Sequence, residues 1–348
     1  MIKIYTIGLL ISTSVIILSV FESCRKTDTN VTKGPTPLVL TIPSGFPPPS
    51  DLFRNNPPTK EGFELGRRLF YDGRLSADGN FPCASCHQQF AGFATLDHDF
   101  SHGVADQFTT RNAQPLFNLA WHKEFHWDGG INHLEVQPLA PITAPNEMAE
   151  TVENIIRKLN ADTSYKRMFR EAFQTNVIDS RNMLRALSQF MGMIVSANSK
   201  YDQVKRGERT FTSAEQRGYA LFQQRCGACH TEPLFTDLSY RNTGLPVRPS
   251  LNDVGRMQIT GKSADSLKFK VPSLRNIFQT GPYGHDGRFW SVSAVIDHYR
   301  FGVVNGPTTD PLVKNRIQLS DFDRNDLIIF LRTLTDSTML NDRRFGPY

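Results

Sequence analysis

Cys83-Ala84-Ser85-Cys86-His87 and Cys226-Gly227-Ala228-Cys229-His230 are the two stretches that decide the architecture of this chain. Both follow the C-x-x-C-H pattern that attaches c-type haem. Two thiols one helical turn apart can form thioethers to the porphyrin, and the adjacent histidine reaches the iron from the proximal side. A structural zinc site would need further cysteine or histidine pairs nearby, and a redox dithiol would not need a histidine after its second cysteine in both copies. The sequence therefore predicts two covalently attached haem c groups, one at each motif.

A second repeated feature precedes each haem motif. Gly66-Arg67-Arg68-Leu69-Phe70 and Gly218-Tyr219-Ala220-Leu221-Phe222 share a G-x-x-L-F pattern at helical spacing. Thr212 and Glu215 have the spacing of a capping box at the start of the second of these helices. We expect the two glycines to let a later helix cross closely.

Each half of the chain closes with an amphipathic pattern. Helices are predicted at 182–195, with Ser180 as the cap, and at 323–334, with Ser320 as the cap. Residues 200–209 are polar and lack helical periodicity, so the domain boundary is placed there. The predicted fold class is all-α, with two cytochrome c-like haem domains in tandem.

Length and charge agree with this organisation. The chain has 348 residues, more than one hydrophobic core usually spans, and we expect domains at 51–205 and 206–348. The net charge is +5, and the basic residues are scattered without a run that could follow a phosphate backbone. Nucleic acid is therefore not an expected partner.

Residues 1–24 are expected to be an export signal. An almost unbroken apolar stretch runs from Ile4 to Phe21, and Cys24 follows in a pattern that resembles a lipoprotein processing site. The alternative is an uncleaved membrane anchor, because the apolar stretch is close to the length that spans a bilayer. Residues 25–50 are polar and proline-rich, which predicts a tether. Since haem c is attached outside the bacterial cytoplasm, we expect a protein of the periplasm or cell envelope that is lipid-anchored through Cys24.

The segment between Cys86 and the domain boundary is much longer than a minimal cytochrome needs. Further motifs lie before, within and after it: L-G-R-R-L-F (65–70), R-L-S (74–76), R-N-A (111–113), W-D-G (127–129), F-K-V-P-S-L-R-N (269–276) and G-P-Y-G-H-D-G (281–287). With these motifs the chain resembles the bacterial di-haem cytochrome c peroxidase family, in its MauG-like branch, from about Phe63 to Thr335. That combination is far more specific than the haem motifs alone.

The resemblance implies roles for three residues of the first domain. Trp127 would lie between the haems, while Gln137 and Glu147, ten and twenty residues further on, would line the peroxide pocket. A distal carboxylate can move the proton from the inner to the outer peroxide oxygen before the O–O bond breaks, and an amide can order the peroxide or a water. Taken singly, the three residues would also fit a core aromatic, a loop amide and a surface salt bridge.

The chain departs from the common family form at the first haem. In many members a histidine sixteen residues after the motif histidine blocks the distal side until the enzyme is reduced, and here that position is Gly103. His102 or His98 could take the role if the loop shifts. Otherwise the first haem is open in its oxidised resting form, with His87 as its protein ligand.

A second departure concerns the distal ligand of the other haem. The common form has methionine nineteen residues after the threonine of the Thr-x-Pro motif, and counting from Thr280 reaches Tyr299. Methionine ligation raises a haem's reduction potential, whereas an anionic phenolate favours the oxidised iron. His298 is the rival ligand, but neighbours on an α-helix point about 100° apart, so one of the two faces the iron. We expect His230 and Tyr299.

The resemblance also implies a calcium ion between the domains. Asn112 would bind it through its side chain, and Thr280 and Pro282 through backbone carbonyls. All three are hard oxygen donors suited to calcium.

These features together predict a di-haem peroxidase that reduces hydrogen peroxide with electrons from a small periplasmic cytochrome c or cupredoxin. One alternative is MauG-like long-range oxidation of a protein or a small molecule, which Tyr299 favours. The other is a non-enzymatic electron carrier, which Glu147, Gln137 and the absence of histidine at position 103 argue against. A homodimer is left open.

Overall fold

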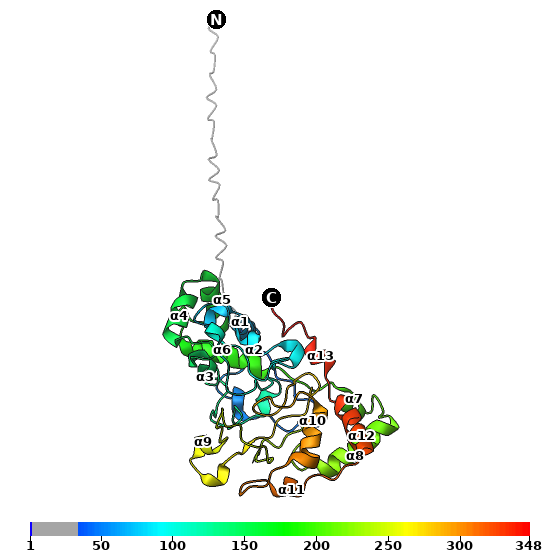
Figure 1. Cartoon of the computed structure of the whole chain (residues 1–348). Helices are drawn as coiled ribbons and strands as arrows, with labels where there is room; N and C mark the ends of the chain where they lie inside the picture. The colour runs from blue at the N-terminus through cyan, green and yellow to red at the C-terminus, as the bar shows by residue number, and fades with distance from the viewer. Residues whose placement is uncertain (2–33) are drawn as a thin grey trace. The chain divides into compact units, whose positions relative to one another are not determined.

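The computed structural model describes Met1 and residues 34–348, and it is mostly helical with one small sheet, as the predicted all-α class requires. Strands β1 (Tyr240–Arg241) and β2 (Phe269–Lys270) pair antiparallel. The α-helices, drawn in Figure 1, are α1 (Lys60–Phe70), α2 (Cys83–Cys86), α3 (Leu139–Thr143), α4 (Val152–Asn160), α5 (Thr163–Phe173), α6 (Ser180–Gly192), α7 (Lys200–Lys205), α8 (Ser213–Arg225), α9 (Met257–Thr260), α10 (Val292–Asp297), α11 (Pro311–Lys314), α12 (Asp321–Arg332) and α13 (Ser337–Leu340).

The first hydrophobic core forms where α1 crosses α6. A Cβ at Gly66 would lie 2.0 Å from the backbone oxygen of Ala186, so only glycine permits this approach, as the sequence predicted. The cap of α6 differs from the prediction. Asp179 accepts the hydrogen bond from the Asn182 backbone N–H, and Ser180 is already helical. Aspartate and serine are comparable caps, so the sequence could not separate two adjacent candidates.

The second core repeats this geometry with α8 and α12. A Cβ at Gly218 would lie 2.0 Å from the backbone oxygen of Asp326. The predicted capping box of Thr212 and Glu215 is confirmed, and Ser320 caps α12 as expected. Each haem motif is thus preceded by a helix that packs closely against a later helix, and a glycine permits the close contact in both cases.

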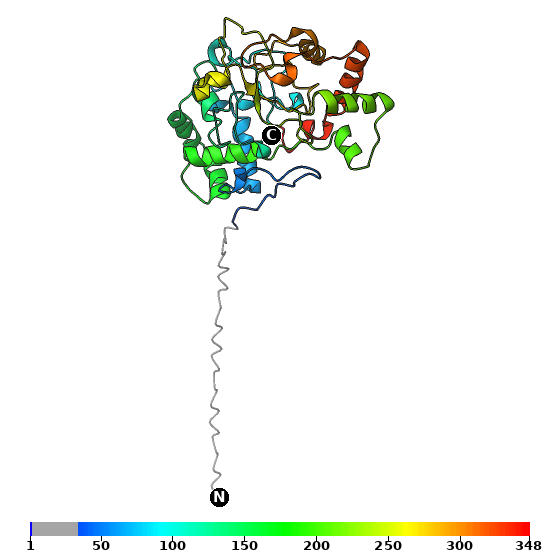
Figure 2. The same ribbon diagram turned by 90° about the horizontal axis from the view of Figure 1, so that it is seen from below.

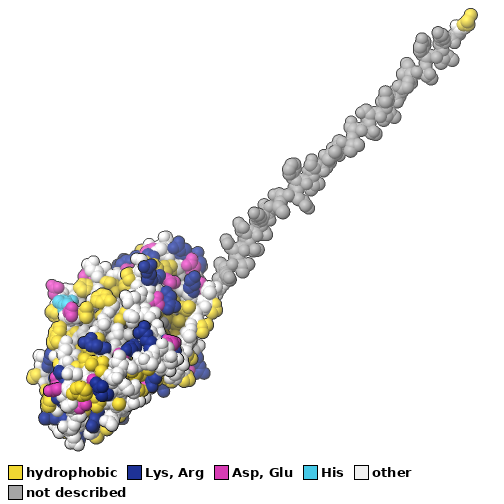
Figure 3. Space-filling model, turned by 90° about the vertical axis from the view of Figure 1, so that its right-hand side faces the viewer, with side chains coloured by type: hydrophobic (Ala, Val, Ile, Leu, Met, Phe, Trp, Pro, Cys, Tyr) yellow, Lys and Arg dark blue, Asp and Glu magenta, His cyan; other side chains and the backbone are white. Residues whose placement is uncertain are grey.

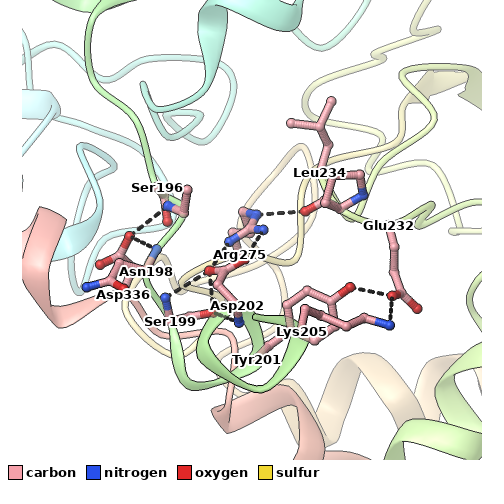
Figure 4. A network of polar contacts seen from close by, with 12 residues as sticks. Ser196, Asn198, Ser199, Tyr201, Asp202, Lys205, Glu232, Leu234, Arg275 and Asp336 are labelled. Atoms are coloured by element: carbon pink, nitrogen blue, oxygen red, sulfur yellow. Dashed lines mark hydrogen bonds and ion pairs between the residues drawn. The ribbon is translucent and has the colours of Figure 1, made fainter. Parts of the chain in front are cut away.

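The segment at 200–209 lacks helical periodicity in the sequence, yet its first part is helical. Residues 200–205 form α7, which Ser199 and Asp202 begin with a capping box. Tyr201 is buried in the second core, and Asp202 pairs with the fully buried Arg275, as Figure 4 shows. The helix has six residues, fewer than two turns, and is too short for hydrophobic periodicity in the sequence to reveal it.

The last residues of the chain return to the first core. Met339 and Phe345 are buried among its side chains, and the Gln89 side-chain amide donates to the backbone oxygen of Asp342 at 2.8 Å. The Tyr348 hydroxyl donates to the backbone oxygen of Glu64 in α1 at 2.6 Å. The two cores therefore do not follow the two halves of the sequence strictly.

Residues 34–50 also contact the body, which corrects the prediction of a free tether for this part of 25–50 (Figure 2). Phe46 lies edge-on against Trp121 at 5.1 Å, and the Trp121 indole N–H donates to the backbone oxygen of Pro47. Proline lacks an N–H but keeps its carbonyl acceptor, so a proline-rich segment can still be held by its partners. Residues 1–24, Cys24 and 25–33 lie outside the described residues, apart from Met1.

Among the residues that the structure describes, no helix is long and apolar enough to cross a membrane. On the face drawn in Figure 3, basic and acidic side chains are interspersed with apolar ones.

Candidate active site

The first C-x-x-C-H motif folds as the short helix α2 followed by His87. Neither cysteine forms a disulfide with another described residue. The Nδ1 atom of His87 lies 2.7 Å from the backbone oxygen of Phe93, so the imidazole is oriented by one nitrogen and keeps Nε2 for a metal. Burial lowers the pKa of His87 to about 4, which keeps the ring neutral at physiological pH. The donor set of two thiols and one oriented imidazole fits a covalent haem.

The second motif follows α8 and has the same arrangement. Nδ1 of His230 lies 3.1 Å from the backbone oxygens of both Phe235 and Pro272. The F-K-V-P-S-L-R-N segment, which contains Pro272, also anchors the loop after this histidine. Its Ser273 hydroxyl donates to Leu234, and its Arg275 Nε donates to Pro233, each to the backbone oxygen. This segment therefore holds the proximal side of the second haem site.

Tyr299 lies in a π-helical turn, residues 298–302, that continues α10. Burial raises the pKa of its phenol well above the ordinary value, and the nearby thiols of Cys226 and Cys229 add to that shift. His298 instead places Nε2 2.9 Å from the backbone oxygen of Thr243. The turn thus brings Tyr299, and not His298, to the cysteines of the second motif. Single π-turns within helices are frequent at functional sites.

Glu147 is half-buried near the first motif. Burial raises the pKa of Glu147, and no described neighbour offsets this shift. The carboxylate in turn contributes to the raised pKa of Cys86, after burial and against a hydrogen bond from Ser101. The structure therefore brings the sequence-predicted carboxylate to the first haem motif.

Gln137 and Trp127 are held by neighbours that differ in kind. Nε2 of Gln137 lies 3.3 Å from Nε2 of His126. Trp127 is buried, and its indole N–H donates to the backbone oxygen of Asn112 at 2.9 Å. The backbone oxygen of Trp127 accepts a hydrogen bond from the Lys270 N–H at 2.7 Å. Trp127 is thereby tied to both halves of the chain.

His98 and His102 are both exposed, with ring centroids 5.1 Å apart. His102 also packs on Phe108, at 4.5 Å between ring centroids. Gly103 is buried beside Glu147. The backbone oxygen of His102 lies 3.8 Å from Cys86 Sγ, so this loop runs beside the first haem motif.

The residues expected to bind calcium lie in ordered backbone. Asn112 donates its backbone N–H to His285 and its side-chain amide N–H to the backbone oxygen of Asp99 at 3.1 Å. Thr280 and Pro282 flank Gly281, and the Gly281–Pro282 peptide bond is cis. Within residues 34–348 no group of three His, Cys, Asp or Glu side chains could hold a metal ion. A cation site there would depend on amide and carbonyl oxygens, which is the donor set that these positions offer.

Sequence reasoning missed two residues beside Trp127. His126 precedes Trp127 in the chain and adopts a left-handed conformation with φ of 67°. Lys270 is 4% exposed, and burial lowers its pKa to about 8. Its Nζ atom donates to the backbone oxygen of Glu124 at 2.5 Å. The apolar neighbours Phe269 and Val271 indicated that Lys270 could be buried. Nothing in the sequence connected Lys270 with Trp127.

Comparison with known proteins identifies this arrangement. A family model for di-haem cytochrome c peroxidase matches residues 60–210, and a cytochrome c model matches residues 215–335. The chain is 37% identical to methylamine utilization protein MauG of Methylorubrum extorquens, over 80% of this chain and 79% of that protein. It is 32% identical to cytochrome c551 peroxidase of Nitrosomonas europaea, over 78% and 79% of the two chains.

A solved structure gives the same result. The crystal structure of a MauG-like protein associated with microbial copper homeostasis superposes with a TM-score of 0.80 at 33% identity, covering 89% of this chain and 99% of that one. This chain therefore belongs to the di-haem cytochrome c peroxidase family, and it is a haem peroxidase with two haem c groups.

Proposed function

We propose that this chain reduces hydrogen peroxide at the haem held by Cys83, Cys86 and His87, with Glu147 as the group that moves the proton. The overall reaction takes two electrons and two protons to convert one peroxide into two waters, and the electrons come from a small cytochrome c or cupredoxin. The observation that carries the proposal is the half-buried Glu147 carboxylate beside Cys86.

The haem, when bound, supplies the iron that accepts peroxide and the electrons that cleave the O–O bond. Glu147 accepts the proton from the inner peroxide oxygen and returns it to the outer one, so that water leaves. The raised pKa of Glu147 suits a group that must both accept and release a proton. No described residue donates a hydrogen bond that would hold the carboxylate in its ionised form.

Gln137 orders the peroxide beside this carboxylate. An amide nitrogen can only donate, so His126 Nε2 accepts in the contact between them, and the Gln137 carbonyl is left to receive a hydrogen bond from the peroxide. Burial lowers the pKa of His126, with Asp128 opposing and Lys270 and Arg111 adding to the shift, which keeps its ring neutral and able to accept.

Trp127 carries electrons between the two haems, and His230 with Tyr299 ligates the second one. Two observations support these roles. Trp127 is bonded to both halves of the chain, and the π-helical turn directs Tyr299 to Cys226 and Cys229. Asn112, Thr280 and Pro282 bind calcium. The mature protein is periplasmic and lipid-anchored through Cys24.

A second candidate function is long-range oxidation of a protein or small molecule, the alternative that the resemblance to the MauG-like branch implies; one relative is named methylamine utilization protein MauG. Tyr299 favours it, because a phenolate stabilises the oxidised second haem and makes that haem a poor resting store of electrons. The two functions share the peroxide site and differ in the donor that reduces the oxidised haems: a small redox protein in the first, and the oxidised substrate in the second.

Stopped-flow absorbance tests the peroxide site on the fully oxidised holoenzyme. The wild type should react with peroxide without prior reduction. Glu147→Gln keeps the shape but not the acid–base function, and it should slow the reaction by about 10²–10⁴-fold with both haems retained. Glu153→Gln, at an exposed position in α4, is the matched control. An unchanged rate in Glu147→Gln would falsify the role of Glu147.

A further inference from the structure

Position 103 requires glycine because there is no room for a Cβ atom, and not because its backbone conformation is unusual. Its φ of −111° and ψ of −168° are extended values that any residue adopts. A Cβ at this position, however, would lie 2.3 Å from the backbone oxygen of Asn146 and 2.7 Å from that of Glu147. Both neighbours are backbone atoms, so they cannot rotate away as a flexible side chain could.

The loop around Gly103 is bonded directly to the backbone of Glu147. The Val104 N–H donates to the Glu147 oxygen at 2.8 Å, and the Asn146 side-chain amide donates to the Phe108 oxygen at 2.9 Å. On its other side Glu147 donates its own N–H to the oxygen of Ala144 at 3.0 Å. The backbone of Glu147 is thus held from both sides, while its carboxylate has no bonded partner among the described residues.

The same loop is also bonded to the first haem motif. The Ser101 and Thr95 hydroxyls lie 2.6 Å apart, and Thr95 donates to the backbone oxygen of Cys86 at 2.7 Å. The Cys86 thiol faces the backbone oxygen of His102 at 3.8 Å. Residues 101–108 therefore form a bridge between the haem attachment helix and Glu147.

We propose that Gly103 is a positioning residue that sets Glu147 over the peroxide side of the first haem by letting this bridge pack directly against residues 146–147. The inference rests on the proposed proton-transfer role of Glu147 and extends it. Any side chain at position 103 pushes the Glu147 backbone away by its Cβ alone. A ligating side chain at this position and the observed placement of Glu147 therefore exclude each other in this chain.

A double-mutant cycle on the holoenzyme tests the inference, with the peroxide reaction of the oxidised protein as the readout. Gly103→Ala should slow the reaction by at least about 10-fold, and by no more than the 10²–10⁴-fold attributed to the acid–base group itself. In the Glu147→Gln background, Gly103→Ala should slow it no further, because the group through which Gly103 acts is gone. Gly306→Ala is the control, since a Cβ there meets only Thr309 Oγ1 at 3.7 Å.

The outcomes separate this inference from the proposed function. If Glu147→Gln reacts like the wild type, the function proposed for Glu147 is wrong. If Glu147→Gln is slow but Gly103→Ala is unimpaired, or if the two effects multiply, Gly103 does not act through Glu147. Should Gly103→Ala fail to accumulate with two haems, Asn146→Ala, which removes the bond to Phe108 without adding an atom, replaces it in the same cycle. If Asn146→Ala reacts at the wild-type rate, or if its effect multiplies with that of Glu147→Gln, the inference is also wrong.

Discussion

Asp202→Asn should destabilise the protein far more than its single-atom change suggests. The Arg275 side chain is fully buried, and the Asp202 side chain is 7% exposed. The carboxylate accepts two hydrogen bonds from the guanidinium, at 2.9 and 2.7 Å (Figure 4). Replacing the charge with an amide leaves a buried guanidinium without a counter-ion, a change that costs about 3–5 kcal/mol when a partner is removed. Because asparagine keeps one acceptor oxygen, we expect the lower end, about 3 kcal/mol of unfolding free energy.

Urea unfolding of the holoprotein at neutral pH, followed by far-ultraviolet circular dichroism, measures this loss as a lower midpoint at an unchanged slope. Glu208→Gln is the control, since Glu208 pairs with Arg206 at the surface and should leave the midpoint unchanged. Burial alone would raise the pKa of Asp202, but the bonds and charge of Arg275, together with the bonds from Ser199, outweigh it and lower the pKa. The stabilisation is therefore fully present above about pH 3.9, the ordinary aspartate value, and is lost as pH falls through the lower folded pKa.

The difference in unfolding free energy between the wild type and Asp202→Asn should accordingly become smaller only in acid. A loss below about 1 kcal/mol at neutral pH, the range of an exposed pair, would refute the reasoning, and so would a gap that is the same at every pH.

Further predictions concern the haems. The intact mass of denatured protein matured with a cytochrome c assembly system should show two covalent haems, and one or none would contradict the assignment of both motifs. Electron paramagnetic resonance of the oxidised protein should show one high-spin and one low-spin haem; two low-spin signals would mean that His98, His102 or another side chain closes the first iron. Tyr299→Met should raise the reduction potential of the second haem in a spectroelectrochemical titration, while His298→Gln should leave it near the wild-type value; the reverse pattern would make His298 the ligand.

The helical frame could be predicted because its signals are local. The G-x-x-L-F glycines implied close helix crossings, and the structure places Gly66 and Gly218 against the closing helices as expected. Thr212 and Ser320 were found from short capping patterns for the same reason. Residues 34–50 and α7 escaped prediction because tertiary partners hold them, and composition and periodicity do not register such partners.

The candidate site divides in a similar way. The roles of Glu147 and Gln137 were implied by the family resemblance, through their spacing from Trp127, and they stay predictions. Lys270 could not be connected with Trp127 from the sequence, because the two are brought together only by the fold. The contact of His126 with Gln137 likewise depends on how the intervening loop folds. Tyr299 was expected from its place nineteen residues after Thr280 in the family pattern. The geometry of an α-helix indicated only that one of Tyr299 and His298 faces the iron, and the segment is in fact a π-helical turn. In the structure Nε2 of His298 lies 2.9 Å from the backbone oxygen of Thr243, a contact 55 residues distant in the sequence, while ligation by Tyr299 stays a prediction.

The return of the C-terminal residues to the first core has a consequence for biosynthesis. Phe345 completes a core that begins at α1, and Asp342 receives its hydrogen bond from Gln89, two residues after His87. The N-terminal haem site therefore cannot reach its final packing until residues 339–345 are available to complete its core. A haem attached to Cys83 and Cys86 before that point would be attached to an unfinished domain, which residues 339–345 complete afterwards.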